Sequence, residues 1–329
     1  MDRQIDFFQE ITKIRQLKLR WCTNNVNNQK LNYRYKSKEK MIKKIFENKN
    51  SDWDIVIKAK TGWFDINLKE LWKAKDLIGM FVYRDFIALY KQTILGPLWY
   101  LIQPLFTAGV FTLIFGKLAN ISTDEIPQLL FYMSGTINWQ YFSESLNKTA
   151  ITFKKNANIF GKVYFPRLTV PISIVITNLL KYAIQFILFL VVFFIIYSRG
   201  APVSPNLLAL AFTPFLLIQM ILLGLGFGIW ISSITTKYRD LVIMLPFFIQ
   251  LWMYGTPIVY PLSLVPDSVK PFLAINPMVS IIEQFRYAFL GAGTVNFQYI
   301  IIGWIVTLFV FITGIIIFNK IEKNFMDTI

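Results

Sequence analysis

Residues 170–197 read VPISIVITNLLKYAIQFILFLVVFFIIY. Lys181 is the only charged residue in this run. As an α-helix the run is about 42 Å long, which is enough to cross the roughly 30 Å of hydrocarbon in a bilayer. A helix that is apolar on all sides is typical of a membrane span, so this stretch predicts an integral membrane protein.

Five further apolar runs are long enough to span a bilayer: 97–117, 127–147, 206–235, 241–262 and 297–319. Hydrophobic residues make up 55% of the 329 residues and charged residues only 16%, with a mean hydropathy of +0.48. This composition is typical of a membrane protein, and the six runs predict an all-α protein with six transmembrane helices. The second run is the weakest, because Asn138, Gln140 and Glu144 interrupt it.

The positive charge is distributed as membrane topology requires. The net charge is +15, and residues 1–93 hold 20 of the 34 Lys and Arg and 11 of the 19 Asp and Glu, a local net charge of +9. Most other basic residues lie between apolar runs, and the largest group separates the second and third runs: Lys148, Lys154, Lys155, Lys162 and Arg167. Because Lys and Arg stay on the cytoplasmic side, this pattern predicts that both termini are cytoplasmic. It also argues against a nucleic-acid partner.

Several kinds of catalytic chemistry are excluded by composition. The chain has no His and a single Cys, Cys22. Zinc sites, Ser-His-Asp triads and Cys-His nucleophiles therefore cannot be built from it, and neither can a disulfide. We assign no catalytic residue and no metal ligand.

The ends of the apolar runs suggest three regions. Residues 1–66 form a basic cytoplasmic extension, in which 24–50 reads as a solvated linker rich in Asn and Lys. Residues 67–93 predict helices over 68–75 and 76–92 that lie in the membrane interface on the cytoplasmic side. Residues 94–329 form the transmembrane domain.

Five prolines lie between the fifth and sixth runs, at Pro257, Pro261, Pro266, Pro271 and Pro277. Prolines at this density forbid one continuous helix, yet the segments around them remain apolar. The sequence therefore predicts two short re-entrant helices on the outer side, buried against protein or water.

Specific motifs follow one another from about residue 76 to the end of the chain: YKQTILGPLWYLIQP (90–104), FGKL (115–118), IFGKVYFPRL (159–168), YRDL (238–241) with PIVYPLSLVP (257–266), and INPMVSIIEQFRYAFLG (275–291). In this order and spacing they resemble the membrane subunits of bacterial polysaccharide-export ABC transporters. These are ABC-2 type permeases that export O-antigen, capsule or teichoic acid. Residues 1–60 have no counterpart in the compact members of that family.

The resemblance implies partners as well as a fold. Family members work as homodimers in the bacterial cytoplasmic membrane, and two separate ATPase subunits drive them. The sequence agrees, because neither Gly-Lys pair, at 116–117 or at 161–162, has the spacing of a phosphate-binding loop. ATP and magnesium would be bound by the partner, and this chain would need no cofactor.

The resemblance also suggests where the partners bind. The cytoplasmic segment after the second span corresponds to the coupling helix, so Lys154, Lys155, Asn156 and Phe160 are candidate ATPase contacts. Alternatively, the lysines only set topology. Arg84 and Lys91, on the interfacial helix, are candidates for attracting the head group of a lipid-linked substrate, or they only anchor the helix to an anionic leaflet.

In the family, the first and fifth spans line most of the pore, where aromatic rings can stack on sugars. The pore-lining candidates are Tyr100, Phe106, Phe111, Lys181, Phe248, Trp252 and Tyr260. Each ring can equally serve the lipid interface or the core, and the long Lys181 side chain can extend to the interface. At the outer mouth the candidates are Glu283 and Arg286, which can pair at i, i+3 as a gate or as a structural ion pair.

Taken together, these features predict an ATP-driven exporter of a lipid-linked, O-antigen-like polysaccharide. An ABC-2 exporter of a lipid or drug would share the six spans. A polytopic glycan-modifying enzyme would need catalytic carboxylates on an outer loop, where only Asp124, Glu125, Asp267 and Glu283 are present. An ATP-independent glycan flippase would typically have about twice as many spans.

Overall fold

The structure, a computed structural model, describes residues 68–88, 91, 96–163, 165–235, 238 and 240–324. The chain forms two compact units, 1–61 and 62–329, and every described residue belongs to the second. The expected basic extension and its linker lie outside the described residues.

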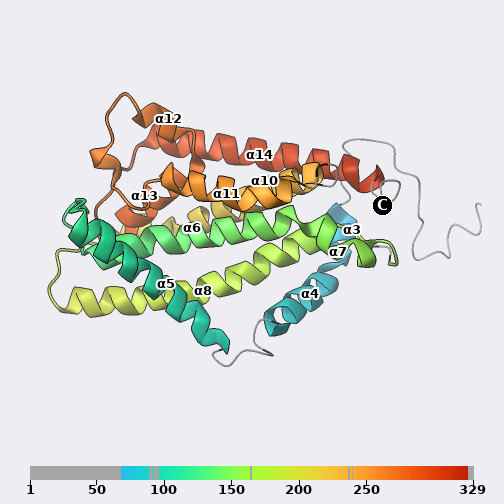
Figure 1. Ribbon diagram of the computed structural model, residues 1–329, viewed down its shortest axis with the longest axis horizontal. Helices are drawn as coiled ribbons and strands as arrows, with labels where there is room; N and C mark the ends of the chain where they lie inside the picture. The colour runs from blue at the N-terminus through green and yellow to red at the C-terminus, as the bar shows by residue number, and fades with distance from the viewer. Residues whose placement is uncertain are drawn as a thin grey trace, which may run out of the picture. The chain divides into compact units, whose positions relative to one another are not determined.

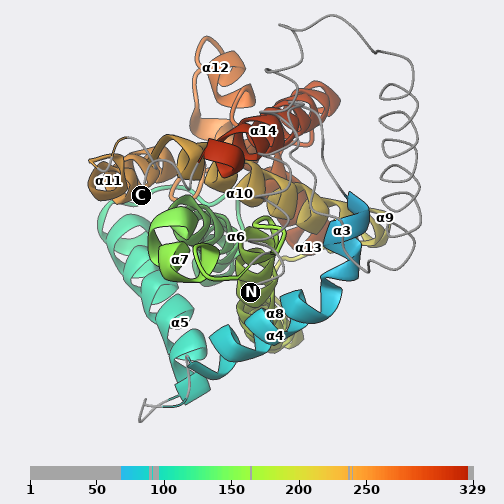
Figure 2. The same cartoon turned by 90° about the vertical axis from the view of Figure 1, so that its right-hand side faces the viewer.

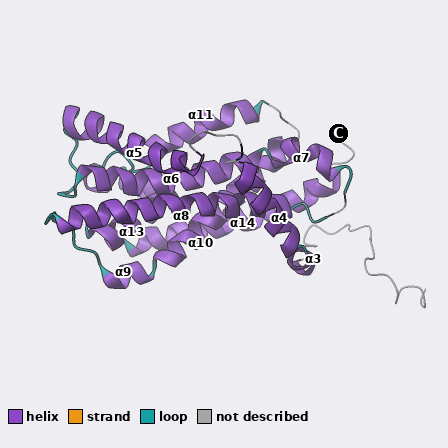
Figure 3. Cartoon of the chain, turned by 90° about the horizontal axis from the view of Figure 1, so that it is seen from below, coloured by secondary structure: helices purple, strands orange, loops and turns teal. Residues whose placement is uncertain are grey.

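Every regular element in the described part of the chain is a helix (Figure 3). The α-helices are α3 (Leu68–Lys73), α4 (Lys75–Ala88), α5 (Trp99–Phe111), α6 (Gln128–Ala150), α7 (Thr152–Phe160), α8 (Thr169–Ser198), α9 (Leu207–Ala211), α10 (Thr213–Thr235), α11 (Leu241–Tyr254), α12 (Lys270–Ala274), α13 (Pro277–Leu290) and α14 (Phe297–Asn324). Short 3-10 segments, η1 (Gly96–Leu98) and η3 (Leu262–Leu264), and a π-helix, η2 (Thr112–Leu118), complete the set.

Four helices are long and apolar enough to cross a membrane. They are α5 continued by η2, α8, α10 and α14. The prediction of an all-helical membrane protein is confirmed. The other two expected spans differ from these four, because α6 is less apolar and α11 has only 14 residues.

The less apolar helix, α6, lies at the centre of the bundle (Figures 1 and 2). It contacts α5, α8, α10, α11 and α13. Sixteen of its 23 residues are buried. A helix surrounded by protein can carry polar side chains when its neighbours or its own backbone accept their hydrogen bonds. In α6, the hydroxyls of Ser134 and Thr136 donate to backbone carbonyls one turn earlier.

The helices α10 and α14 approach each other closely through glycines. A Cβ atom added to Gly226 of α10 would lie 2.9 Å from the Cα of Phe311 in α14. One added to Gly314 would lie 2.8 Å from the carbonyl oxygen of Gly226. Small residues at such crossings let helix backbones pack directly in a membrane.

The expected fifth span, 241–262, ends early as α11. Residue 256 precedes Pro257, and the residue before a proline is disfavoured in a helix. The chain turns there instead, and Thr256 is buried, with its hydroxyl accepting a hydrogen bond from Asn276 at 2.9 Å. Asn276 also caps α13, where its Oδ1 accepts from the amide of Met278 at 3.1 Å.

The helix α5 is irregular along its length. Gly96 at its start has a φ of 45°, Pro104 interrupts its middle and the π-helix η2 forms its end. Pro104 and Ala108 are its buried residues. Proline and π-helical segments bend helices and occur often at functional sites, so α5 is the least regular of the long helices.

The two ends of the bundle differ in composition. The helix α4, the short helix α7 and the C-terminal end of α14 lie at one end (Figure 1). The loops that follow η2 and α8 lie at the other end with α12. The basic group Lys148 to Arg167 surrounds α7, so the first end carries the charge expected of the cytoplasmic side.

Candidate functional site

The short helix α7 has one exposed and one buried face. Lys154 and Lys155 are exposed. Asn156 and Phe160 are buried, and the Asn156 amide donates to the carbonyl of Thr152 at 3.0 Å. The predicted ATPase contact is therefore open to a partner at the two lysines, whereas Asn156 and Phe160 face the interior and hold the helix in place.

A row of phenylalanines lies beneath α7 and connects it to two other helices. From α4 to α14, the successive ring centroids are 5.8, 5.7, 5.8 and 4.8 Å apart. The rings belong to Phe81, Phe165, Phe160, Phe153 and Phe318. Aromatic pairs at these distances attract each other beyond simple burial, so α7, α4 and α14 share one core. We call this set the phenylalanine row.

The two head-group candidates have different surroundings. The Arg84 guanidinium is bound to the neighbouring Asp85 carboxylate at 2.8 Å and lies 4.8 Å from the ring of Phe81. Lys91 is exposed. Because Asp85 compensates much of the Arg84 charge, Lys91 is the better of the two candidates for an anionic lipid.

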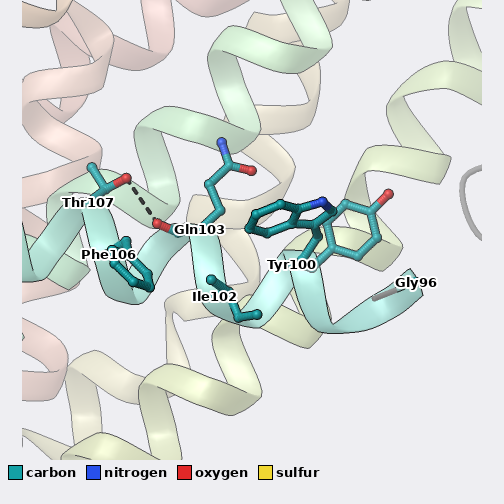
Figure 4. A pocket seen from close by; sticks show the side chains of 7 residues that line it. Gly96, Tyr100, Ile102, Gln103, Phe106 and Thr107 are labelled. Carbon is teal, nitrogen blue, oxygen red and sulfur yellow. Dashed lines mark hydrogen bonds between the residues drawn. The ribbon is translucent and has the colours of Figure 1, made fainter. Parts of the chain in front are cut away.

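A hollow of about 790 Å³ runs along α5 (Figure 4). It contains two of the pore-lining candidates, Tyr100 and Phe106, and Phe106 is 71% exposed. The rest of the lining lies outside the candidates predicted from the sequence: Gly96, Trp99, Ile102, Gln103 and Thr107. The helical spacing of Trp99, Gln103 and Phe106 is the signal that would have identified this face.

The other aromatic candidates divide between the surface and the core. Phe248 of α11 is half exposed. Trp252 packs 5.1 Å from the rings of both Phe142 and Phe227. Phe111 packs against two rings on the inner side of α5, those of Phe115 and Tyr132. The Tyr260 hydroxyl donates to the carbonyl of Tyr254 at 3.2 Å.

Lys181 is buried and paired. Its ammonium lies 3.1 Å from Oε2 of Glu144 and 5.1 Å from the centre of the Tyr100 ring. The same Oε2 also accepts from Lys148 at 2.7 Å. A cation in the middle of a long apolar helix needs a counter-charge or water, and a carboxylate on α6 is the counter-charge of Lys181. We call Glu144, Lys148 and Lys181 the charged triad.

The charged triad belongs to a longer polar seam between α6 and α8. The Tyr182 hydroxyl donates to Oδ1 of Asn138 at 2.9 Å. Asn178 accepts from Lys148 at 3.2 Å and donates to the hydroxyl of Ser145 at 3.2 Å. The polar residues that weakened α6 as a predicted span thus meet polar residues of α8.

Glu283 and Arg286 form a buried ion pair on α13 at 3.2 Å. The guanidinium of Arg286 also donates to the carbonyl of Ile258 at 3.1 Å and lies 3.6 Å from the centre of the Phe131 ring. The second Glu283 oxygen accepts from the amide of Thr294 at 3.0 Å. The pair therefore joins α13 to α6, to the turn after α11 and to the segment before α14, and its predicted place at a pore mouth stays a prediction.

The described residues contain no group of three or more His, Cys, Asp or Glu side chains that is arranged to hold a metal ion. The groups that come together are instead suited to binding and packing. They are the exposed lysines of α7, the aromatic hollow on α5 and the charged triad. The described part of the chain thus offers helix surfaces and a partly buried charge cluster.

Comparison with known families gives a single assignment. The profile of the ABC-2 type transporter family matches residues 76–290, which is most of the second compact unit. The chain belongs to the ABC-2 type transporter family.

Three relatives illustrate the range of this ABC-2 permease family. The chain is 30% identical to the O-antigen export system permease protein RfbA of Klebsiella pneumoniae over 253 residues, covering 77% of this chain and 94% of the relative. It is 29% identical to RfbA of Myxococcus xanthus over 225 residues, 68% of this chain and 83% of the relative. It is 26% identical to the polysialic acid transport protein KpsM of Escherichia coli over 240 residues, which cover 71% of this chain and 89% of the relative.

Membership of the ABC-2 family establishes whether this chain is a transporter subunit or an enzyme. ABC-2 permeases are the membrane subunits of transporters and are not enzymes themselves, so this chain is a permease subunit. The family also implies an ABC ATPase as partner and a location in a membrane. The matched region contains α7, the hollow on α5, the charged triad and the Glu283–Arg286 pair.

Proposed function

We propose that this ABC-2 permease moves a lipid-linked surface polysaccharide, O-antigen-like in kind, across the bacterial cytoplasmic membrane. The observation that carries the proposal is the similarity to an O-antigen export permease along 94% of that relative's length. The hollow on α5 supports it, because exposed rings such as Trp99 and Phe106 can stack on the apolar faces of sugars.

For the topology we propose six spans, α5 with η2, α6, α8, α10, α11 and α14, with both termini cytoplasmic. The central helix α6 crosses as an interior helix because its neighbours shield its polar side chains. As an α-helix, α11 is about 21 Å long. The buried turn 256–259 extends the crossing, and α12 and α13 re-enter from the outer side. The basic residues around α7 support this orientation.

We further propose that the permease works as a homodimer with two ATPase subunits. The helices α5 and α11 lie on the same side of the bundle (Figures 2 and 3). Both turn apolar side chains outward, among them Phe106 of α5 and Phe247 and Phe248 of α11. A second copy facing this side would enclose a pore lined by these rings. Lys91, beside the start of α5, would attract the lipid head group to its entrance.

The export proposal is tested by deleting the gene and restoring it. Deletion is expected to remove the polysaccharide from the cell surface while lipid-linked polymer accumulates inside the cell. The purified chain is expected to co-purify with an ABC ATPase, and ATP hydrolysis is expected to respond to the polymer only in the complex. Normal surface polysaccharide in the deletion strain would refute the proposal.

The exposed face of α7 gives a more local test. Replacing both Lys154 and Lys155 with glutamate reverses two charges on the surface that we propose meets the ATPase. We expect the amount of ATPase recovered with the permease to fall about tenfold or more, because the reversal turns the attractive charge contact that we propose for this surface into a repulsive one. The matched control is Lys162→Glu, an exposed lysine just after α7. Equal recovery with the double variant and the wild type would contradict the docking assignment.

The same experiments separate the alternative functions. An ABC-2 exporter of a lipid or drug would bind the ATPase, but its deletion would leave the surface polysaccharide intact. A glycan-modifying enzyme would change the structure of the polymer and would co-purify with no ATPase. We favour export because the relatives named above are transport proteins for polysaccharides.

A further inference from the structure

We propose that the charged triad is a binding site for the phosphate or diphosphate group of a membrane lipid. Lys148 and Lys181 would hold the anion, and Glu144 would position the two lysines. The inference rests on the topology proposed above, which places the Lys148 end of α6 in the cytoplasmic leaflet.

The charge of the triad is the first observation. Both ammonium groups bond to the same oxygen of Glu144, at 2.7 and 3.1 Å, so a single phosphate group can reach both. Among the described residues, no second carboxylate pairs with either lysine, and the other groups in contact, the Asn178 amide and the Tyr100 ring, are uncharged. The triad therefore carries a net charge of +1.

A surplus cation inside a membrane protein requires a counter-charge or water. One lysine suffices to neutralise Glu144, so the triad keeps one positive charge, and Lys148, which is 41% exposed, carries it where a ligand can reach. The two ammonium groups, which bond to the same carboxylate oxygen, also repel each other, and an anion placed between them would reduce that repulsion. The triad thus has the charge and the donors of an anion site.

Access to the triad is open on one side. Lys181 is nearly enclosed, with 8% of its side chain exposed, whereas Lys148 is 41% and Glu144 is 31% exposed. Lys148 lies in the last turn of α6, immediately before α7. In the topology proposed above, this position would lie at the level of the lipid phosphates in the cytoplasmic leaflet.

The surroundings indicate what kind of molecule carries the phosphate. Tyr100, whose ring contacts Lys181, also lines the hollow on α5 (Figure 4). The rest of that lining is mostly apolar and aromatic. A molecule with its phosphate at the triad can lay its apolar part along α5, which is the shape of a phospholipid or of a polyprenyl diphosphate.

The test uses the full chain in nanodiscs of phosphatidylcholine, with no ATPase. The probe is a short-chain polyprenyl diphosphate, and its binding is measured by equilibrium titration. We expect Lys148→Met and Lys181→Met each to weaken binding about fivefold or more, the usual effect of one basic residue on an anionic lipid. Glu144→Gln is expected to tighten binding, because it removes the competing carboxylate and leaves an acceptor for the lysines.

Lys162→Met is the matched control, because Lys162 is an exposed lysine at the same end of the bundle. Thermal unfolding of each variant identifies any loss of fold. Lys148 is partly exposed at the end of α6, so Lys148→Met decides the outcome if Lys181→Met does not fold. Binding by Lys148→Met that matches the Lys162→Met control would overturn the proposal. So would a Glu144→Gln variant that loses affinity as the lysine variants do.

Phosphatidylglycerol then identifies the source of the phosphate. If it displaces the polyprenyl diphosphate at similar concentrations, the site holds ordinary anionic phospholipid. If it does not, the site selects a carrier lipid. The binding assay does not depend on export, so the two proposals can fail separately. If the deletion strain keeps normal surface polysaccharide but the purified permease still binds the probe, the proposed function is refuted and the binding site is retained.

Discussion

Replacing Arg286 with leucine is expected to lower the free energy of unfolding by about 3–5 kcal/mol. The guanidinium is 1% exposed and is bound to Glu283, to the Ile258 carbonyl and to the Phe131 ring. Its loss leaves the Glu283 carboxylate buried without its counter-charge and removes the link from α13 to the turn after α11. Unfolding of the purified permease in mixed detergent micelles measures the change.

The chain contains a matched control for this variant. Asp267 and Lys270 pair with the same i, i+3 spacing at 2.7 Å, but Asp267 is almost fully exposed. Lys270→Leu is therefore expected to have no measurable effect, because exposed ion pairs contribute little. The double variant Glu283→Leu with Arg286→Leu should recover part of the lost free energy of unfolding, because it leaves no unpaired charge in the interior. An Arg286→Leu variant as stable as Lys270→Leu would show that the buried pair does not hold α13 against α6 and the turn after α11.

Gly226→Ala is expected to destabilise the permease by about 1–3 kcal/mol. The added methyl group would lie 2.9 Å from the Cα and 3.0 Å from the amide nitrogen of Phe311. Both atoms belong to the backbone of α14, so no side-chain rotation can relieve the contact. The two helices must separate instead, and the packing between α10 and α14 is reduced along their length.

Gly79→Ala provides the control, because nothing lies within 4 Å of a Cβ atom at Gly79 in α4. Alanine is the better helix former, so this change should leave stability unchanged or raise it slightly. Thermal unfolding of both variants in the same detergent measures the difference. A Gly226→Ala variant that unfolds at the wild-type temperature would mean that α10 and α14 are not in backbone contact.

Much of the helical framework could be predicted from hydropathy alone. The expected spans 170–197 and 297–319 correspond closely to α8 and α14, because long apolar runs have few alternatives in a membrane. The helix within the expected span 241–262 is shorter than the apolar run, because the chain turns before Pro257. Asn138 and Glu144 marked α6 as the weakest span, but its central position depends on contacts with helices distant in the sequence.

The candidate site was less predictable than the fold. Lys181 could be recognised as a residue needing a partner, but its partner Glu144 lies 37 positions earlier and depends on how α6 packs against α8. On α7, Phe153, Asn156 and Phe160 follow helical spacing, and this period predicts a buried face more strongly than a partner contact. Family resemblance identified the helix, whereas the arrangement of its two faces required the structure.

The phenylalanine row has a mechanical consequence. Protein interiors are nearly incompressible, so rings in contact transmit displacement instead of absorbing it. Phe160 and Phe153 both belong to α7. At one end of the row Phe160 contacts Phe165, which contacts Phe81 of α4, and at the other end Phe153 contacts Phe318 of α14. With an ATPase docked on α7 as proposed above, a displacement of α7 would therefore be passed to α4 and to α14 together.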